Sequence, residues 1–415
     1  MFMKKLHYQM KEKFAPVLLG GDLNCYSVAR SFYEAYGVTS YIIGRYKLGV
    51  TQHSRFIKFI EYADIDKPDK FVVFMHKFGE LHEDEGKLIL MGCGDDYVYL
   101  VSHFKNELKK HFVTSCPSAE LFDYLSNKAN FYTYCEEIGL PYPKTVIYAK
   151  GDELKIPFDY PVVIKPAVSN IYWKHPFEGI EKVFTAYSYE EAKSIVEKIH
   201  GAGYPEKIII QDRIPGDDSY MYTMSTYSDK DGKVRYMTLG HIILEEHTPK
   251  GTGNDAAIIT VEDDALCAKI KNFLESIHYV GFTNWDIKYD RRDNEYKAFE
   301  ANCRQGRSNY HVTAAGDNLA RMIVEDIILG TAYTGCHINR NQIYWRVIPD
   351  KVVFKYAKPE TVAAIKELKR DGEAYNTLLC KDDLHLNPLR AFFVFENQRR
   401  YIEKYKKYYH PENME

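Results

Sequence analysis

Short apolar runs that alternate with helical or polar segments fill the first 115 residues of the chain. These runs predict β-strands, which lie at 16–21, 41–44, 71–74 and 87–92. Between the first two runs, Asn24 to Tyr36 has apolar residues at helical spacing, and Gly37 ends that helix. Strands that alternate with helices are typical of a parallel sheet. We therefore predict an α/β, Rossmann-like domain over residues 1–115.

Two glycine-rich turns follow predicted strands of this domain, at 20–22 and 92–96. Such strand ends bind ligands in parallel sheets, and the backbone N–H groups of the next helix can hold an anion. Neither turn has the G-x-G-x-x-G spacing of a dinucleotide site, which favours structural turns and counts against a nucleotide-linked dehydrogenase. A site for a small acidic substrate stays open there.

A second domain is predicted from residue 116 onward, where Pro117 suits the first turn of a helix. Another helix begins after the capping residue Asn127 and ends at Gly139. Lys128 lies in its first turn, where a lysine is unfavourable against the helix dipole unless an anion is near. The position indicates a phosphate contact, with a solvated lysine as the alternative.

Two apolar strands of this region end in polar residues. The run 160–166 places Lys165 at the end of a buried strand, so its ammonium group needs a counter-charge unless it reaches solvent. The run 207–218 passes from an apolar strand into a polar segment bounded by Pro215. Extended backbone there can offer one N–H and one C=O to a purine edge, and an acidic residue beyond it can accept ribose hydroxyl groups. This second run therefore suits an adenine-binding hinge.

A hairpin is predicted at 284–302, where two strands of alternating residues flank a polar turn. If the turn is centred on Asp293, Asp286 falls opposite Glu300, and alternation places Asn302 on the face of Glu300. Two facing carboxylates destabilise a sheet unless something positive lies between them, and a hard divalent cation with oxygen ligands meets that need. We therefore predict a magnesium site at Asp286, Glu300 and Asn302.

Two pairs of basic residues decide how this hairpin is interpreted. If Lys288 and Lys297 neutralise the carboxylates on a solvated face, no metal is needed. Arg304 and Arg307 follow the return strand, as a site that binds phosphate oxygens and a developing acyl phosphate requires. Their position favours the metal site.

Composition narrows the class of protein without naming its reaction. The net charge of −3 gives no broad basic surface, so nucleic acid is not an expected partner. No apolar run approaches the ~20 residues of a membrane span, and the N-terminus lacks a signal-peptide core, so we expect a cytoplasmic protein. The eight cysteines form no C-x-x-C pair and are expected to be free thiols.

Taken in order, these elements resemble the ATP-grasp superfamily of carboxylate–amine ligases over about residues 116–330. The resemblance implies a two-lobed ATP-grasp domain at 116–335 with a lid subdomain at about 144–215, followed by a C-terminal extension at 336–415. It implies that ATP is held through its phosphates by Lys128 and Lys165, through adenine by Gln211, Asp212, Arg213 and Ile214, and through ribose by Asp217 or Asp218. Asp286, Glu300 and Asn302 would bind Mg²⁺, or Mn²⁺, and Arg304 would steady the transferred phosphoryl group.

One segment departs from the pattern of the superfamily. A glycine-rich loop usually covers the phosphates after the strand that carries the lysine, whereas residues 167–175 of this chain are bulky and aromatic. Ser169 can donate a hydrogen bond to phosphate. Tyr172 and Trp173 can instead pack against another subdomain.

Residues 16–32 are similar to the start of the bacterial D-aspartate ligases, which join the carboxylate of D-aspartate to the lysine side chain of a peptidoglycan precursor. The resemblance implies that ATP converts a carboxylate into an acyl phosphate, which a neutral amine then attacks. Arg304 and Arg307 would stabilise the oxyanion and the leaving phosphate. The loop 245–255, including Lys250, is our candidate for substrate contact, with a surface loop that has no role as the alternative.

Other functions stay open on the sequence alone. They are ligation of another amino acid or peptide, phosphorylation without ligation by a small-molecule kinase or ATPase, and non-catalytic nucleotide binding. The oligomeric state is open as well. In the C-terminal extension we predict strands at 342–347 and 351–355 and helices at 360–370 and 388–407; the basic residues of the last helix either attract an anionic substrate or form a solvated face.

Overall fold

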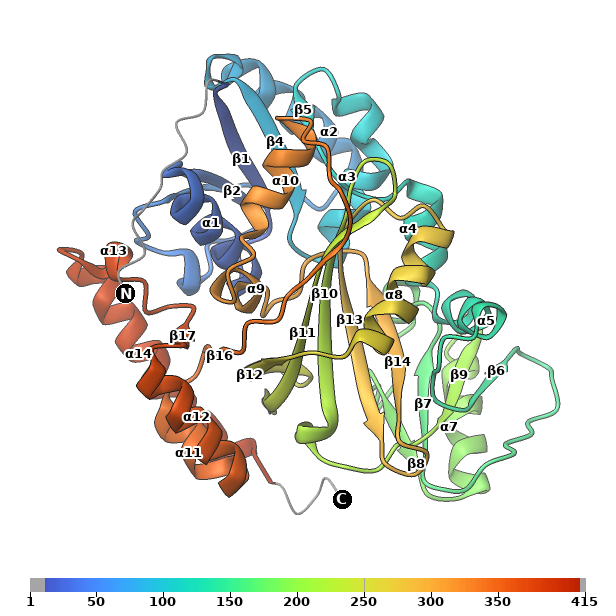
Figure 1. The fold of residues 1–415 in the computed structure, drawn as a ribbon. Helices are drawn as coiled ribbons and strands as arrows, with labels where there is room; N and C mark the ends of the chain where they lie inside the picture. The colour runs from blue at the N-terminus through green and yellow to red at the C-terminus, as the bar shows by residue number, and fades with distance from the viewer. Residues whose placement is uncertain (1–11, 250, 411–415) are drawn as a thin grey trace.

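The computed structural model describes residues 12–249 and 251–410, and its strands form three sheets with helices packed against them (Figure 1). A parallel five-stranded sheet comes first in the chain, a small four-stranded sheet follows, and an eight-stranded sheet lies between them and the C-terminal helices. The fold is therefore α/β, with an antiparallel and a mixed sheet after the parallel one. No helix of the described residues combines the length and the apolar content needed to cross a bilayer.

The first sheet has the strand order β3-β2-β1-β4-β5. Side chains that alternate along β1 divide its two faces: Leu18 packs with α1, while Val17 and Leu19 pack with α2 and α3. The elements are β1 (Phe14–Leu19), α1 (Leu23–Tyr36), β2 (Ser40–Gly44), β3 (Ile57–Glu61), α2 (Pro68–Leu81), β4 (Lys87–Gly92), α3 (Asp95–Leu108) and β5 (Phe112–Val113).

The sequence predictions for this sheet are confirmed for three strands and for the helix that Gly37 ends in a left-handed conformation. The strand predicted at 71–74 is wrong, because these residues lie inside α2. Pro68 starts that helix, and Phe71, Met75 and Phe78 are buried at helical spacing. A four-residue apolar run fits either structure. The third strand, β3, was not predicted because its residues alternate between intermediate and exposed positions.

The small sheet is antiparallel, with the strand order β6-β9-β7-β8. It covers the predicted lid region and carries Lys165 on β7 and Gln211 on β9, which are neighbouring strands. Its core is formed by apolar residues of α7 and the strands. The elements are β6 (Thr145–Tyr148), β7 (Val162–Pro166), α6 (Ser169–Tyr172), β8 (Phe184–Ala186), α7 (Tyr189–Gly201) and β9 (Ile208–Asp212).

The large sheet has the order β14-β13-β10-β11-β12-β16-β17, and β15 pairs with β11. The helices α4, α5, α8, α9 and α10 lie in the same part of the chain (Figure 1). The strands are β10 (Met221–Ser228), β11 (Val234–Glu246), β12 (Asn254–Val261), β13 (Gly281–Asp290), β14 (Glu295–Asn302), β15 (His337–Ile338), β16 (Tyr344–Arg346) and β17 (Ala374–Asn376). The helices are α4 (Ala119–Ser126), α5 (Lys128–Ile138), α8 (Asp264–Ser276), α9 (Tyr310–Ala314) and α10 (Leu319–Ile327).

The C-terminal part adds three strands, β15, β16 and β17, to the large sheet and a group of helices on its outside (Figure 1). The predicted strand at 351–355 is wrong, since these residues form α11 after Pro349, and Val352 and Val353 are buried. The helix predictions near 360–370 and 388–407 are confirmed. The helices are α11 (Asp350–Tyr356), α12 (Pro359–Asp371), α13 (Lys381–Leu384) and α14 (Pro388–Tyr408).

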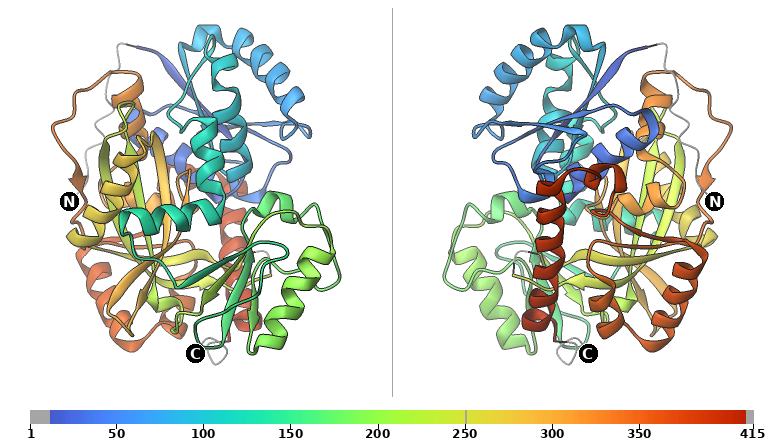
Figure 2. Two further views of the ribbon diagram at one scale, coloured as in Figure 1. Left: turned by 90° about the vertical axis from the view of Figure 1, so that its right-hand side faces the viewer. Right: turned by 90° about the vertical axis from the view of Figure 1, so that its left-hand side faces the viewer.

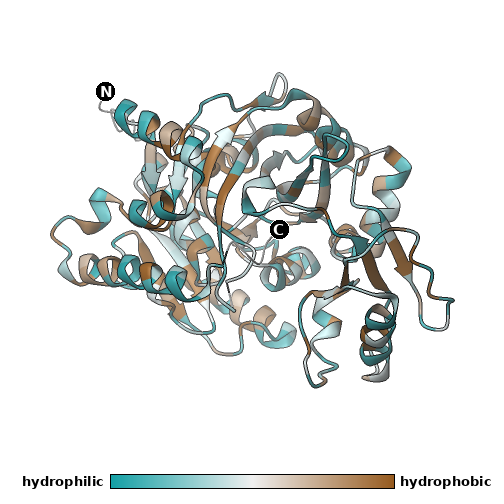
Figure 3. Ribbon diagram, turned by 90° about the horizontal axis from the view of Figure 1, so that it is seen from below, coloured by the Kyte–Doolittle hydropathy of each residue, from teal (hydrophilic) through white to brown (hydrophobic). Residues whose placement is uncertain are grey.

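Hydropathy follows this arrangement of sheets and helices. In Figure 3, hydrophobic residues (brown) lie along the strands. Along the outer helices, hydrophilic residues (teal) alternate with hydrophobic ones. The same alternation defines the apolar cores under each sheet.

A buried ion pair joins the C-terminal helices to the first sheet. Arg390 on α14 donates to the carboxylate of Asp383 at 2.9 Å, and both side chains are 0 % exposed. The same carboxylate accepts hydrogen bonds from the hydroxyl of Tyr26 at 2.8 Å and the backbone N–H of Arg55 at 2.9 Å. Because these donors come from distant parts of the chain, Asp383 holds α13 and α14 against the N-terminal domain.

We expect Asp383→Ala to lower the free energy of unfolding by about 3–5 kcal/mol, because it leaves the buried guanidinium of Arg390 without a counter-charge. Urea unfolding monitored by circular dichroism measures the change. Arg399→Ala, which removes an ion-pairing arginine from the exposed side of the same helix, is the matched control and should leave stability unchanged. Equal effects of the two substitutions would contradict the role given to Asp383.

Candidate functional site

The hairpin of β13 and β14 brings the two predicted carboxylates together. Asp286 pairs with Glu300 and Asn284 pairs with Asn302 across the two strands, which confirms the predicted register. The side-chain amide of Asn302 donates to the carboxylate of Asp286 at 3.2 Å. These residues therefore form one polar patch on the large sheet.

The two carboxylates of this patch have opposite tendencies to ionise. Burial, and then the neighbouring charge of Glu300, raise the pKa of Asp286 to about 7. Burial acts on Glu300 in the same direction, but the ammonium of Lys128, 2.6 Å away, and that of Lys165 outweigh it and lower the pKa of Glu300 to about 2. Glu300 is therefore the stable anion of the pair, and Asp286 becomes fully anionic only when more positive charge arrives.

The lysines of the hairpin itself do not neutralise this pair. Lys288 donates to the backbone carbonyls of Ile214 and Gly216 at 3.0 and 2.7 Å. Lys297 pairs with acidic residues of the hairpin turn and of β14. The alternative in which these two lysines neutralise the carboxylates on a solvated face is therefore wrong. The counter-charge for Glu300 comes from α5 instead.

The donor set at this patch suits a hard divalent cation. Asp286 and Glu300 supply carboxylate oxygens and Asn302 supplies an amide oxygen, which is the oxygen-only chemistry that Mg²⁺ prefers. Within residues 12–249 and 251–410, no group of three or more His, Cys, Asp or Glu side chains is arranged to hold a metal. A metal here would therefore rest on two carboxylates and a neutral amide.

Cationic side chains from two elements converge on Glu300. Lys128 begins α5, and its backbone N–H donates to the carbonyl of Ala167 at the end of β7, which fixes the helix start beside that strand. Lys165 leaves β7 and donates to the hydroxyl of Tyr132 at 2.9 Å. Burial, and then Lys128, lower the pKa of Lys165 to about 7. Such a lysine lacks a full counter-charge and is prepared for an anion.

Lys182 is a third lysine that acts on this group, and it was not predicted from the sequence. Its charge contributes to the lowered pKa of both Glu300 and Lys165. It lies in the segment between α6 and β8, in the predicted lid. The sequence offers little signal for it, because Lys182 lies between elements with no strand or helix pattern around it.

The predicted adenine hinge joins the small sheet to the large one. Gln211 is buried, and its amide donates to the hydroxyl of Thr145 at 2.8 Å. The carboxylate of Asp212 forms an ion pair with Arg292 at 2.7 Å, and its backbone N–H donates to the carbonyl of Lys144 at 3.0 Å, so neither group is free for a ligand. Beyond β9, Arg213 is half-buried and Ile214 is buried, in an extended segment that leads to β10.

The structure separates the two acidic residues predicted near ribose. Asp218 is buried, and its carboxylate is occupied by the backbone N–H of Glu245 at 2.8 Å and by His247 at 2.9 Å. Asp217 caps the following turn through the backbone N–H of Ser219, and its side chain is 34 % exposed. Asp217 is therefore the more accessible of the two.

Arg304 and Arg307 link the hairpin to other parts of the site. Arg304 donates to Asp95, in the first turn of α3, at 3.0 Å and to the amide oxygen of Asn302 at 3.3 Å. Arg307 lies 3.5 Å from the carboxylate of Glu246 at the end of β11. The structure thus places Arg304 beside Asp286 and Glu300, where it also reaches α3 of the first domain, whereas Arg307 lies at the end of β11.

Two further acidic residues belong to this neighbourhood and were not predicted as site residues. Asp255 accepts a 2.6 Å hydrogen bond from Ser308, and burial raises its pKa to about 6. Burial, and then the charge of Asp218, raise the pKa of Glu245 well above its usual value. Both lie in the segment 245–255, which was predicted to contact substrate. The segment was therefore predictable from the sequence, whereas the separate roles of these two residues were not. Lys250 of that loop lies outside the described residues.

The bulky loop after β7 folds back on the small sheet. Ser169 begins the short helix α6, and its side chain is partly buried. Tyr172 is buried in the core of the small sheet, where its hydroxyl donates to the carbonyl of Glu181, whereas Trp173 is 51 % exposed. The alternative that Tyr172 and Trp173 pack against another subdomain is therefore wrong, because Tyr172 packs within its own small sheet and Trp173 is half exposed. A phosphate contact of Ser169 stays a prediction.

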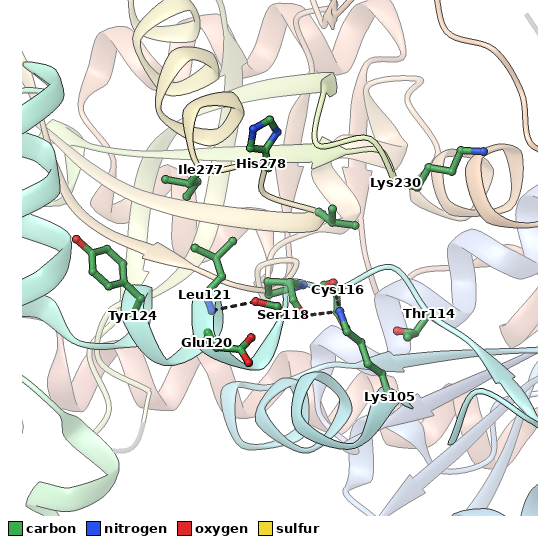
Figure 4. A pocket seen from close by; sticks show the side chains of 12 residues that line it. Lys105, Thr114, Cys116, Ser118, Glu120, Leu121, Tyr124, Lys230, Ile277 and His278 are labelled. Atoms are coloured by element: carbon green, nitrogen blue, oxygen red, sulfur yellow. Dashed lines mark hydrogen bonds between the residues drawn. The ribbon is translucent and has the colours of Figure 1, made fainter. Parts of the chain in front are cut away.

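A cavity of about 700 Å³ lies away from these residues (Figure 4). It is bordered by α4, by Lys105 and by the turn that contains His278, and none of the predicted site residues lines it. Lys105 donates there to the backbone carbonyls of Cys116 and Pro117. Its ammonium group therefore fastens the segment between the first sheet and α4.

Comparison with known proteins places the chain in a family. No family model matches it. It is 39 % identical over 413 residues to the D-aspartate ligase of Enterococcus faecium (strain Aus0004), which covers 96 % of this chain and 97 % of that protein.

Solved structures of low sequence identity share the fold. The L-amino acid ligase from Bacillus licheniformis superposes with a TM-score of 0.54 at 13 % identity, over 76 % of this chain and 75 % of its own. The N5-carboxyaminoimidazole ribonucleotide synthetase PurK, solved as an ADP complex, gives a TM-score of 0.56 at 13 % identity, over 81 % and 82 % of the two chains. With the fold and the full-length relative in agreement, the chain belongs to the D-aspartate ligase family of ATP-grasp enzymes, ATP-dependent ligases that form carbon–nitrogen bonds.

Proposed function

We propose that this enzyme activates the carboxylate of D-aspartate, or of a similar amino acid, and joins it to an amine of a peptidoglycan precursor. The substrate follows from the name of the full-length relative, which covers nearly all of both chains. The observation that carries the chemistry is the pairing of Asp286 with Glu300, surrounded by Lys128, Lys165 and Arg304. The arrangement combines a cation site with receptors for phosphate oxygens.

Asp286, Glu300 and Asn302 would hold Mg²⁺, or Mn²⁺ in its place. A bound Mg²⁺ neutralises charge on the phosphates of ATP as the γ-phosphoryl group moves. The raised pKa of Asp286 supports this assignment, because a divalent cation favours the anionic form that burial and Glu300 disfavour.

The lysines supply the second part of the phosphate site. Lys128 and Lys165 approach Glu300 from neighbouring elements, and Lys182 adds its charge from the lid. When triphosphate enters, these ammonium groups can exchange the carboxylate and hydroxyl for phosphate oxygens. Ser169, at the start of α6, is our candidate for a further hydrogen bond in place of the glycine-rich loop.

The hinge and its neighbours would hold the nucleoside. The backbone of Gln211, Asp212, Arg213 and Ile214 leads from the small sheet to the large one, and it suits the edge of a purine. Of the two acidic candidates for ribose, Asp217 is favoured, because the carboxylate of Asp218 is already occupied.

The arginines act on the substrate carboxylate. Transfer of the γ-phosphoryl group gives an acyl phosphate, and the amine displaces phosphate from its carbonyl carbon. Arg304, together with Arg307, would stabilise the oxyanion that forms in that step and the phosphate that leaves. Lys250 remains a candidate for contact with substrate. Because an acyl phosphate hydrolyses in water, the lid at about 144–215 would close over the site.

The domain division that accompanies this mechanism is a Rossmann-like part at 1–115, an ATP-grasp part at 116–335 and an extension at 336–415. Its support is the order of the sheets, since the parallel sheet ends at β5 and the small sheet starts at β6. The contact of Arg304 with Asp95 indicates that the first part contributes to the site.

We expect phosphate release from ATP, in the presence of Mg²⁺, to require both D-aspartate and an acceptor that carries the free amine of a lysine side chain. A panel of amino acids, measured with and without the acceptor by a colorimetric phosphate assay and by mass spectrometry of the product, makes the test. Phosphate release at the same rate with and without the acceptor would point to a kinase or ATPase and would overturn the ligase mechanism.

Glu300→Gln should lower kcat by about 10²-fold or more while leaving the protein folded, because it removes a charged ligand of the metal. Circular dichroism checks the fold, and steady-state kinetics over a range of Mg²⁺ concentrations checks the role. Glu295→Gln, at the other end of the same strand, is the matched control and should keep wild-type turnover. Wild-type activity of Glu300→Gln would refute the metal assignment.

Lys165→Met should raise the free energy of unfolding, and this increase should be about 1–2 kcal/mol larger at pH 6 than at pH 9. The folded pKa of Lys165, about 7, lies below its unfolded value of about 10.5, so the stability of the wild type falls as the pH drops through that range. Below pH 7 the wild type must keep a charged amine in a buried place, and methionine removes that cost. Denaturant unfolding at the two pH values measures it. Lys198→Met, on the exposed side of α7, should show no such dependence, and an equal effect at both pH values would contradict the assignment.

A further inference from the structure

The outward side of α14 exposes a row of large apolar side chains. Leu389, Phe392 and Phe395 are 62, 67 and 64 % exposed, and Leu386, just before the helix, is 84 % exposed. Residues three apart are neighbours on a helix surface, so Leu389, Phe392 and Phe395 form a continuous strip, and Leu386 lies just before the start of the helix. These four side chains are here called the α14 apolar face. In the right-hand view of Figure 2, this dark red helix lies on the outside of the molecule, toward the viewer.

The other side of α14 is firmly packed. Val394, Tyr401 and Tyr405 are buried, and Arg390 is fully buried in its ion pair with Asp383. The hydroxyl of Tyr405 also donates to the backbone carbonyl of Glu245 at 2.6 Å. The helix is therefore fixed in place, and its apolar face is a preformed surface rather than the result of a loosely attached segment. Contiguous apolar faces of this kind mark interaction sites.

The charge of the helix changes along the same side. Between residues 388 and 408 there are six Lys and Arg residues against two Glu. Arg390 is buried in its ion pair with Asp383 and Lys404 pairs with Glu246, so the exposed cations of the helix are Arg399, Arg400, Lys406 and Lys407. Arg399 and Lys406 follow Phe392 at intervals of seven residues, two helical turns each, so they continue the line of the apolar face. Both glutamates of the helix, Glu396 and Glu403, are paired with Arg399.

We propose that the α14 apolar face docks this protein on an anionic lipid surface. A helix that combines exposed leucine and phenylalanine with lysine and arginine beyond them lies in the plane of a lipid interface, where the apolar groups reach the acyl chains and the cations reach the lipid phosphates. Leu386, Leu389, Phe392 and Phe395 supply the apolar part, and the exposed Arg400, Lys406 and Lys407 supply the cations. This docking is independent of the proposed substrates.

Charge and area both favour lipid over a second copy of the chain. Two helices packed in parallel through this face would bring their cationic halves together. Four side chains of one helix also offer far less than the ~800 Å² that each partner buries in a stable interface. An anionic lipid surface meets the same cations with opposite charge.

The test is co-sedimentation of the full-length chain with vesicles of phosphatidylcholine alone and of phosphatidylcholine mixed with phosphatidylglycerol. We expect binding to the mixed vesicles only, weakened by added salt. The double substitution Phe392→Ser and Phe395→Ser should lower the vesicle partition coefficient about tenfold or more, and Lys406→Glu with Lys407→Glu should lower it as well.

A matched control removes apolar side chains of equal exposure elsewhere. Val73→Ser with Leu81→Ser, on α2, changes residues that are 70 and 68 % exposed and should leave the partition unchanged. Equal binding to both vesicle types, or binding that survives the α14 substitutions, would overturn the proposal. So would a dimer in analytical ultracentrifugation that the Phe392→Ser and Phe395→Ser variant disperses, because the occupant of the face would then be a second copy. Circular dichroism confirms that each variant is folded.

Discussion

The pairing of Asp286 with Glu300 across β13 and β14 is the constraint on which the site depends. Two carboxylates held opposite each other in a sheet repel unless positive charge accompanies them. In this structure Lys128 supplies that charge to Glu300 at 2.6 Å, which leaves Asp286 with a pKa near neutrality. The site is thus partly neutralised by the protein and is completed by what it binds.

The charges around this pair come from separate sheets. Lys165 leaves the small sheet, while Arg304 reaches from the large sheet to Asp95 of the first domain. At the far end of the chain, Asp383 and Arg390 fasten the last helices to the first sheet. Because the charges of the site come from several segments, the distances between them depend on how the sheets are placed relative to one another. Buried ion pairs far from the site therefore contribute to function by fixing that placement.

Periodicity predicted most elements correctly, and its failures have a common cause. The runs 71–74 and 351–355 were predicted as strands but are helical, because four or five apolar residues fit a buried strand and a turn of helix equally well. In both cases a proline near the start of the segment, Pro68 or Pro349, was the signal for the helix. The long helix at 388–407 was correct because many turns repeat its pattern.

Local sequence patterns were enough to predict the pairing of Asp286 with Glu300 and the oxygen-rich character of the predicted metal site, since alternation along a strand and the spacing across one turn are local properties. They did not predict the strand β3 or the shift in register between Asp286 and Ile287. Only the tertiary structure decided which charges meet. It brought Lys128 to Glu300 across 172 residues, occupied Asp218 with His247, and drew Lys182 and Asp255 into the neighbourhood. Such contacts depend on the packing of separate sheets, and their sequence separation leaves no periodic trace in the chain.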